Sequence, residues 1–305
     1  PEVEPVVEAV EQPPLTDPVE TEPVIDPQPV VEVVEYGCGG VFKQGGLLIC
    51  EVPASGVVYK NGKKVNGVTD GGIATIGLRQ NEDAIVTVEW MDRAGQIGGT
   101  EYEIAPRYDD VRNLKGMDCD KVDARTQEQK DHAGRSWKKK VDAFAKFHKP
   151  AAHSISFMKP ADGPTSSPFG PTRHYSGVSK VTGETCKKTS VHRGQDFATP
   201  VGTDLVAPMA GTVILADPDL YYEGGAIFVD HGYGLVSVFM HLSEVDVKAG
   251  DIVLQGERLG ATGNTGRTTG PHLHWAVKWR ADHSDKRSDD FYIDPQLLLS
   301  LADGG

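Results

Sequence analysis

Short runs of alternating apolar and polar residues recur over residues 38–107, which is the pattern of half-buried β-strands. The runs "AIVTVEW" and "TEYEIA" flank a glycine-containing turn, and in the second of them Tyr102 and Ile104 alternate with glutamates. The pair Asn61-Gly62 favours the left-handed conformers of a type I′ hairpin turn. The pattern predicts a small β-sandwich-like domain at residues 37–112.

A second group of strands is predicted from about residue 160 onward. The runs are "GTVILA", "GAIFVD", "LVSVFMH", "DIVLQG" and "HLHWAVKW", and "DHGYG" between the second and third is typical of a hairpin turn. No alternation of strands with helices is visible, which argues against a doubly wound sheet. We therefore expect a mainly β protein, whose second β-rich domain covers residues 154–303.

One helix is predicted between these two regions, at residues 124–148. Trp137, Val141 and Phe144 follow at i, i+4 and i+7 and form one apolar stripe. Lys138, Lys139 and Lys140 are interpreted as a solvated face. Residues 113–153 are accordingly predicted to be a linker that contains a helix.

Residues 1–36 have a different composition from the rest of the chain. They hold ten acidic residues, many prolines and no Lys or Arg. Like charges repel and proline fixes φ, so we expect an extended acidic spacer, with a tail of no specific role as the alternative. Because the chain begins at Pro1 and shows no signal peptide, we expect a trimmed product, with any anchor upstream of residue 1.

The charge of the chain argues against nucleic-acid binding. The net charge is −13, and subtracting the −10 of residues 1–36 leaves −3 for the other 269 residues. A nucleic-acid-binding domain is typically basic. No apolar run reaches the roughly 20 residues of a transmembrane helix, so no transmembrane segment is predicted in this chain.

The four cysteines lack the C-x-x-C spacing of a structural zinc site. An even number of cysteines fits disulfides formed in an oxidising compartment. Cys38 and Cys50 flank a turn between strands and are suited to pair, which leaves Cys119 with Cys186. Four buried free thiols are the alternative.

Two histidines share one face of the run "GPHLHWAVK". Leu273, Trp275 and Val277 form the apolar face of this predicted strand, so His272 and His274 lie together on the other face. Two protonated imidazoles side by side would repel each other. A metal ion, a carboxylate or a neutral state of the rings removes that conflict.

A further histidine and a carboxylate precede this strand. His192 and Asp196 stand four residues apart in a loop that enters a strand, and His241 ends another strand. Histidine nitrogen and aspartate oxygen are good Zn²⁺ ligands, and three protein ligands plus water are typical of a catalytic zinc site. The residues alone do not choose between His272 and His274 as a ligand, because both lie on the same face.

Three longer stretches resemble successive motifs of the lysostaphin/LytM-type zinc endopeptidases. They are "HRGQDFATPVGTDLVAPMAGTV", "VDHGYGLVSVFMHLS" and "GNTGRTTGPHLHWAV", and "SSPFGPTRH" is similar to the opening of the same domain. The resemblance implies a β-sheet core that floors a groove, and one zinc ion per chain. It implies His192, Asp196 and His274 as zinc ligands. It also implies His241 and His272 as catalytic histidines that do not bind the metal.

The resemblance implies a zinc-dependent endopeptidase that hydrolyses peptide cross-links of bacterial peptidoglycan. We expect an exported protein of the periplasm or cell envelope, for which a D-Ala–diaminopimelate cross-link is the expected bond and stem peptides are the expected partners, alongside other envelope proteins. The alternative is a non-catalytic LytM-like regulator that binds and activates another cell-wall hydrolase. Such regulators usually lack zinc ligands, whereas all five motif residues are present here.

Overall fold

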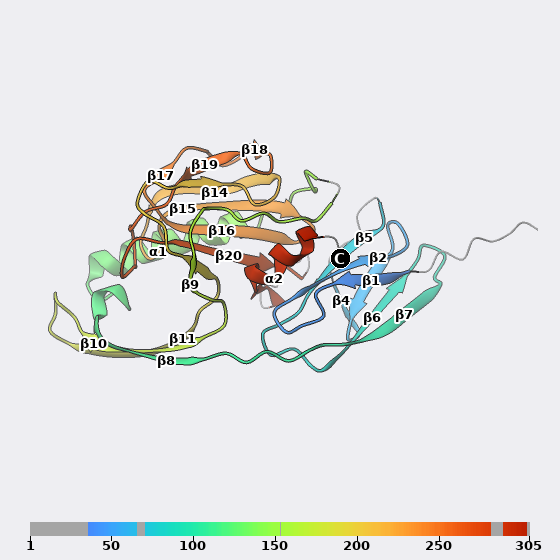
Figure 1. Ribbon diagram of the computed structural model, residues 1–305, viewed down its shortest axis with the longest axis horizontal. Helices are drawn as coiled ribbons and strands as arrows, with labels where there is room; N and C mark the ends of the chain where they lie inside the picture. The colour runs from blue at the N-terminus through green and yellow to red at the C-terminus, as the bar shows by residue number, and fades with distance from the viewer. Residues whose placement is uncertain (1–35, 66–70, 153, 282–288, 304–305) are drawn as a thin grey trace, which may run out of the picture. The chain divides into compact units, whose positions relative to one another are not determined.

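The computed structural model describes residues 36–65, 71–152, 154–281 and 289–303 (Figure 1). Their secondary structure is mainly β, which confirms the predicted fold class. The spacer predicted at residues 1–36 lies outside the described residues except for Tyr36, and the division of the chain into four parts stays a prediction. None of the helices in the described ranges is long and apolar enough to cross a membrane.

The first seven strands form two small antiparallel sheets, in the orders β1-β2-β5 and β4-β3-β6-β7. Their bounds are β1 Gly37–Gly40, β2 Leu47–Glu51, β3 Val57–Lys60, β4 Lys63–Lys64, β5 Ile73–Gly77, β6 Ile85–Met91 and β7 Ile97–Glu103. Asn61 and Gly62, with φ of 49° and 73°, make the turn from β3 to β4, as predicted. Leu48 of one sheet and Val86 of the other are fully buried in the same hydrophobic cluster, so the two sheets share a core.

The largest sheet has eight strands, in the order β18-β14-β15-β16-β20-β12-β9 with β21 paired to β20. Their bounds are β9 Thr165–Ser167, β12 Gln195–Phe197, β14 Gly211–Leu220, β15 Gly224–Gly232, β16 Leu235–Leu242, β18 Ile252–Val253, β20 Leu273–Trp279 and β21 Phe291–Ile293. Leu273, Trp275 and Val277 are fully buried in the main hydrophobic cluster, as the alternation predicts. His274 lies on the opposite face of β20, which therefore points away from the main core.

Smaller elements pack next to the central sheet. A three-stranded sheet has the order β13-β19-β17. The bounds are β13 Asp204–Val206, β17 Glu244–Val245, β19 Arg258–Ala261 and, for the short helix near the end of the chain, α2 Pro295–Leu299. Asp294 caps α2 by accepting a hydrogen bond from the amide of Gln296, so the carboxylate satisfies a free donor of the first helical turn.

The end of β20 is packed tightly against β5 of the first sheets. The Trp279 indole Nε1 donates a hydrogen bond of 3.2 Å to the hydroxyl of Thr75. A Cβ atom at Gly77 would lie only 2.7 Å from Cγ of Trp279, so a side chain at this position would push the indole away. These contacts fix β20 at the end that is farther from His274.

A third sheet, here called the wall sheet, has the order β11-β10-β8, with β8 parallel to β10. Its strands are β8 Val111–Asp118, β10 Thr172–Val178 and β11 Thr185–Val191 (Figure 1). Both predicted disulfides are confirmed, and one of them, Cys119–Cys186, ties the turn of helix η1 (Cys119–Lys121) to β11. The other, Cys38–Cys50, joins opposite residues of β1 and β2.

Helix α1 spans Gln127–Phe144, within the predicted range, and begins with a capping box formed by Thr126 and Gln129. Ala143 and Phe144 pack with side chains of β15, β16 and β20 in a second hydrophobic cluster. Helix α1 therefore covers part of the central sheet, on the face opposite to the main core.

The predicted apolar stripe of α1 is wrong in one respect, because Trp137 is 65 % exposed. The buried side of α1 includes the preceding residue, Ser136, instead of Trp137. The Ser136 hydroxyl accepts a hydrogen bond from the amide of Tyr221. Lys139 and Lys140 are not merely solvated, since they form ion pairs with Asp217 and Glu223. These polar partners, on β14 and in the turn that follows it, fix the rotation of the helix against its apolar pattern.

A chain of hydrogen bonds inside the central sheet supports β20. Trp275 Nε1 donates to the Ser237 hydroxyl over 3.1 Å, and that hydroxyl lies 2.8 Å from His231 Nε2. His231 Nδ1 lies 3.0 Å from the carbonyl oxygen of Ala210, so this nitrogen carries the proton of the ring. The serine then donates to Nε2, and all partners are satisfied only while His231 is neutral.

The neutral state of His231 predicts a loss of stability in weak acid. Burial lowers the pKa of His231 to about 4, whereas the unfolded chain has a pKa near 6.5. Below pH 6.5 the unfolded chain binds a proton at this residue and the folded chain does not. The contribution of the neutral ring to the free energy of unfolding is therefore complete above pH 6.5 and is lost as the pH falls to about 4. Its size is about 3 kcal/mol. Urea unfolding at several pH values measures it.

His231→Asn and His174→Ala provide the comparison for this prediction. Asparagine does not titrate, so the fall in the free energy of unfolding between pH 6.5 and 4 should be smaller in His231→Asn than in the native chain. His174 is exposed on the wall sheet, and its replacement should leave the pH dependence as it is. An equal fall in all three proteins would refute the assignment.

Candidate metal centre

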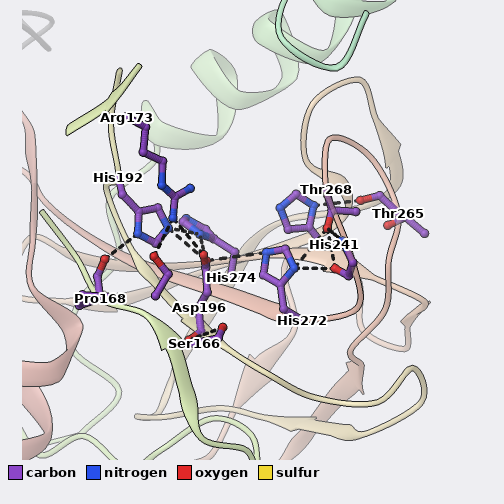
Figure 2. A network of polar contacts seen from close by, with 12 residues as sticks. Ser166, Pro168, Arg173, His192, Asp196, His241, Thr265, Thr268, His272 and His274 are labelled. Carbon is purple, nitrogen blue, oxygen red and sulfur yellow. Dashed lines mark hydrogen bonds and ion pairs between the residues drawn. The ribbon is translucent and has the colours of Figure 1, made fainter. Parts of the chain in front are cut away.

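Three side chains meet at one point beside the central sheet (Figure 2). His192 follows β11, Asp196 lies in β12, and His274 is the residue directly opposite Asp196 on β20. Asp196 Oδ1 is 2.7 Å from His274 Nδ1 and 3.1 Å from His192 Nε2. The two histidine nitrogens, Nε2 of His192 and Nδ1 of His274, are 3.2 Å apart. Residues separated by 82 positions in the chain are thus brought together by strand pairing.

The close approach of these groups depends on Gly194. A Cβ atom at this position would lie 2.6 Å from His274 Nε2. The glycine in "HRGQD" therefore lets the loop between His192 and Asp196 pass directly over the ring of His274.

The electrostatics of the cluster favour forms that can bind a cation. Burial alone would raise the pKa of the Asp196 carboxyl, but its contacts with the rings of His192 and His274 outweigh it and hold this pKa far below its usual range. Burial also lowers the pKa of His274, although Asp196 opposes the shift. An ionised carboxylate and neutral imidazoles are the states that metal coordination requires.

The proton on His192 is placed on the side away from the cluster. His192 Nδ1 lies 2.7 Å from the carbonyl oxygen of Pro168, to which it donates. A neutral ring has only one N–H, so Nε2 presents its lone pair to Asp196 Oδ1 at 3.1 Å. Two acceptors facing each other at this distance repel unless a cation stands between them. Two nitrogens and one carboxylate oxygen are a donor set that catalytic zinc takes, so the residues fit this metal.

Two further histidines lie beside this cluster (Figure 2). The rings of His241 and His272 have centroids 4.8 Å apart, and His272 Nε2 is 3.7 Å from Asp196 Oδ1. His241 Nδ1 lies 2.9 Å from the carbonyl oxygen of Thr265, and His272 Nδ1 lies 2.8 Å from that of Gly270. Both rings therefore keep their protons on Nδ1 and present Nε2 as a base.

His241 has the environment of a functional residue. Burial, with the neighbouring His274 and His272, lowers its pKa to about 3, so the ring is neutral at physiological pH. Its backbone has a φ of 67°, which is uncommon for a residue other than glycine. Strained backbone of this kind occurs preferentially at active sites.

A groove of about 750 Å³ contains all five of these side chains. One side is formed by the wall sheet, which contributes Arg112, Arg173 and Tyr175, and another by the loop around Thr268 and Pro271. The volume of this groove lies in the range of roughly 300–1,000 Å³ that is typical of ligand-binding clefts.

Sequence reasoning singled out all five of these residues and missed the groups that orient them. The carbonyl acceptors of Pro168, Thr265 and Gly270 have no signature in the sequence, because any residue supplies a carbonyl. Arg173 was also missed, although it stands within the quoted run "SSPFGPTRH". Its Nη2 lies 3.3 Å from Asp196 Oδ2, so it bonds to the oxygen that does not face His192 and His274.

The comparison with protein families gives the same reading of this part of the chain. The model of peptidase family M23 matches residues 190–286, a range that contains all five side chains. Residues 190–286 belong to peptidase family M23. This confirms the resemblance to lysostaphin/LytM-type metallopeptidases seen in the sequence.

Two relatives are similar to part of this chain. The chain is 43 % identical over 113 residues to an uncharacterized metalloprotease of Haemophilus influenzae, covering 36 % of this chain and 22 % of that protein. It is 40 % identical over 91 residues to the peptidoglycan DD-endopeptidase ShyA of Vibrio cholerae, covering 30 % of this chain and 21 % of that protein. The matched segments thus span about a fifth of each relative.

A solved structure resembles a larger part of the chain. It is a crystal structure of a Pseudomonas aeruginosa protein assigned to peptidase M23, with 28 % identity and a TM-score of 0.57. The similarity covers 85 % of this chain and 95 % of that one, so it extends beyond the M23 residues 190–286.

Proposed function

We propose that this protein is a zinc-dependent endopeptidase that hydrolyses peptide cross-links of bacterial peptidoglycan. The observation that carries the proposal is the convergence of His192, Asp196 and His274 on one point, with His241 and His272 beside it in an open groove. The name of the Vibrio cholerae relative supports peptidoglycan as the substrate. We further propose the D-Ala–diaminopimelate amide as the bond that is cleaved.

His192, Asp196 and His274 would hold one Zn²⁺ ion, and the carbonyl oxygen of Pro168 fixes the orientation of the His192 ring. When bound, zinc supplies Lewis acidity and makes water a nucleophile near neutral pH. The chain itself contributes the two bases. One of His241 and His272 accepts the proton of the attacking water at Nε2 and delivers it to the leaving amine. The other first takes up a proton at Nε2 from solvent; as an imidazolium it donates a hydrogen bond to the oxyanion that forms on the carbonyl, and it keeps that proton when the products leave.

The alternative of a non-catalytic regulator is not favoured. A regulator needs no set of unprotonated nitrogens around one point. Here His192, His241 and His272 each donate Nδ1–H to a backbone carbonyl, so Nε2 is the unprotonated nitrogen of each ring. We also propose that the protein is exported to the periplasm or cell envelope. The two disulfides support an oxidising compartment.

Digestion of purified peptidoglycan tests the proposed function. The zinc-loaded protein should release monomeric muropeptides from cross-linked dimers, and mass spectrometry should show that each cleavage adds one water across the D-Ala–diaminopimelate amide. A chelator should stop the release, and added zinc should restore it. A zinc-loaded protein that leaves all cross-links intact would contradict the proposal.

A further inference from the structure

The groove is basic in a protein that is otherwise acidic. Five basic side chains line it, against two acidic ones, while the chain as a whole has a net charge of −13. The basic residues are Arg112, Lys121, Arg173, Arg193 and Arg267, and the acidic ones are Asp196 and Glu223. Asp196 belongs to the candidate metal centre, and Glu223 is paired with Lys140 of α1. A cleft lined by one sign of charge concentrates its field and attracts ligands of the opposite sign.

Two of these arginines stand side by side on the wall sheet. Arg112 of β8 and Arg173 of β10 are direct neighbours in the register of the two parallel strands. Arg112 Nη1 lies 3.2 Å and Arg173 Nη2 lies 2.8 Å from the same Ser167 hydroxyl oxygen, which accepts from both. The two guanidinium groups are therefore held next to each other at one point of the groove.

The acidic groups of the described residues compensate the two arginines unequally. In the part of the chain that the structure describes, Arg112 forms an ion pair with Asp110 at 3.7 Å, and the Asp110 side chain is 78 % exposed, so that ion pair is weak. Arg173 contacts the oxygen of Asp196 that faces away from the two histidines. Like charges in adjacent positions of a sheet destabilise it. An anion bound between the two arginines would turn this cost into a favourable interaction.

The positive potential of the wall sheet also acts on Tyr175, two residues after Arg173. Burial alone would raise the pKa of its phenol, but Arg173, with Ser190 and Arg267, outweighs the burial and lowers the pKa. The wall thus favours negative charge at a second point along the groove.

The position of the arginine pair limits where a ligand's charge can be. Arg173 Nη2 is 3.3 Å from Asp196 Oδ2, and Figure 2 shows Arg173 beside His192, on the side of the cluster away from His241. An anion bound here lies directly beside the bond that the proposed enzyme would cleave. A planar guanidinium matches a carboxylate with two parallel hydrogen bonds.

We propose that Arg112 and Arg173 form a binding site for a free carboxylate that a peptide substrate carries next to the cleaved amide, and that this pair determines specificity. The inference rests on the proposed function, which it deepens. In a D-Ala–diaminopimelate cross-link, the carbon that bears the amide nitrogen also bears a free carboxylate. Both arginines lie before the M23 residues 190–286, Arg112 in β8 and Arg173 in β10, so these two strands of the wall sheet would contribute to substrate choice.

A pair of synthetic peptides tests this site. Both contain the D-Ala–diaminopimelate linkage with the amide replaced by a ketomethylene group, which cannot be hydrolysed, and they differ only in that the neighbouring carboxylate is free or is a carboxamide. Calorimetric titration of the zinc-loaded full chain should show at least about 10-fold tighter binding of the free acid, as expected for a charge-assisted hydrogen bond. The difference should shrink at high salt.

Arg112→Gln should reduce the preference for the free acid to about 3-fold or less, since one of the two guanidinium groups is lost. Lys115→Gln is the matched control, because Lys115 lies on the same strand with the same charge and is exposed on the opposite face. It should keep the full preference. If Arg112→Gln folds poorly, Arg112→Lys retains the charge without the planar fork and should give an intermediate preference.

Each outcome separates this inference from the proposed function. Equal binding of the two peptides by the native chain, or an unchanged preference in Arg112→Gln, would overturn the carboxylate site. Cleavage of peptidoglycan in either case would leave the proposed function standing. Conversely, a chain that prefers the free acid through Arg112 but cleaves no cross-link would support the carboxylate site and contradict the endopeptidase.

Discussion

His274→Ala is expected to remove both bound zinc and hydrolysis of peptidoglycan cross-links. The substitution deletes one of three candidate ligands and leaves His192 Nε2 and Asp196 Oδ1, 3.1 Å apart, without their third partner. Loss of a group that only hydrogen-bonds to a metal ligand typically lowers metal affinity by about 10–100-fold. Loss of a ligand itself should therefore lower zinc affinity by more than about 100-fold. Zinc content after dialysis, measured together with muropeptide release, checks both effects.

The matched control for this substitution is His174→Ala. His174 is exposed on β10, and its Nδ1 contacts the side chain of Thr189, outside the cluster. Its replacement should change neither the zinc content nor the activity. Full zinc occupancy in His274→Ala would show that the three side chains do not hold the metal together, and would remove the main support for the proposed enzyme.

His241→Ala should stop cleavage but keep the zinc ion. Its Nε2 is not among the three converging ligand atoms, and its ring centroid is 6.2 Å from that of His274. Removal of a base or donor that acts in the transition state costs about 10²–10⁴ in rate. The loss should therefore be seen in kcat for a soluble cross-linked peptide, while zinc content and thermal stability stay close to those of the native chain.

His241→Asn is the better control for folding, because the backbone here has a φ of 67°. Asparagine adopts this conformation more readily than alanine, so it removes the ring without adding backbone strain. Both variants should lose activity to the same degree. Loss of zinc in both would instead place His241 among the metal ligands and would make the assigned role wrong.

The local pattern of the chain was enough to predict its elements. Alternation along residues 273–279 gave the buried face of β20, and Asn61-Gly62 gave the turn between β3 and β4. Both are decided by side-chain period and by φ preference, which act over a few residues. The rotation of α1 was not predicted correctly, because Trp137 fits the helical period while Ser136 and Lys140 bind polar partners in the turn between β14 and β15.

The sequence by itself determined that this is a mainly β protein with an M23-like set of four histidines and one aspartate. It could not decide from the residues whether His272 or His274 lies against Asp196. Antiparallel pairing with β12 decides that, since it places His274 opposite Asp196 and leaves His272 beside His241. The pairing of Arg112 with Arg173 is likewise visible only after folding, because the register of strands 60 residues apart depends on the packing of the whole sheet and not on any local pattern.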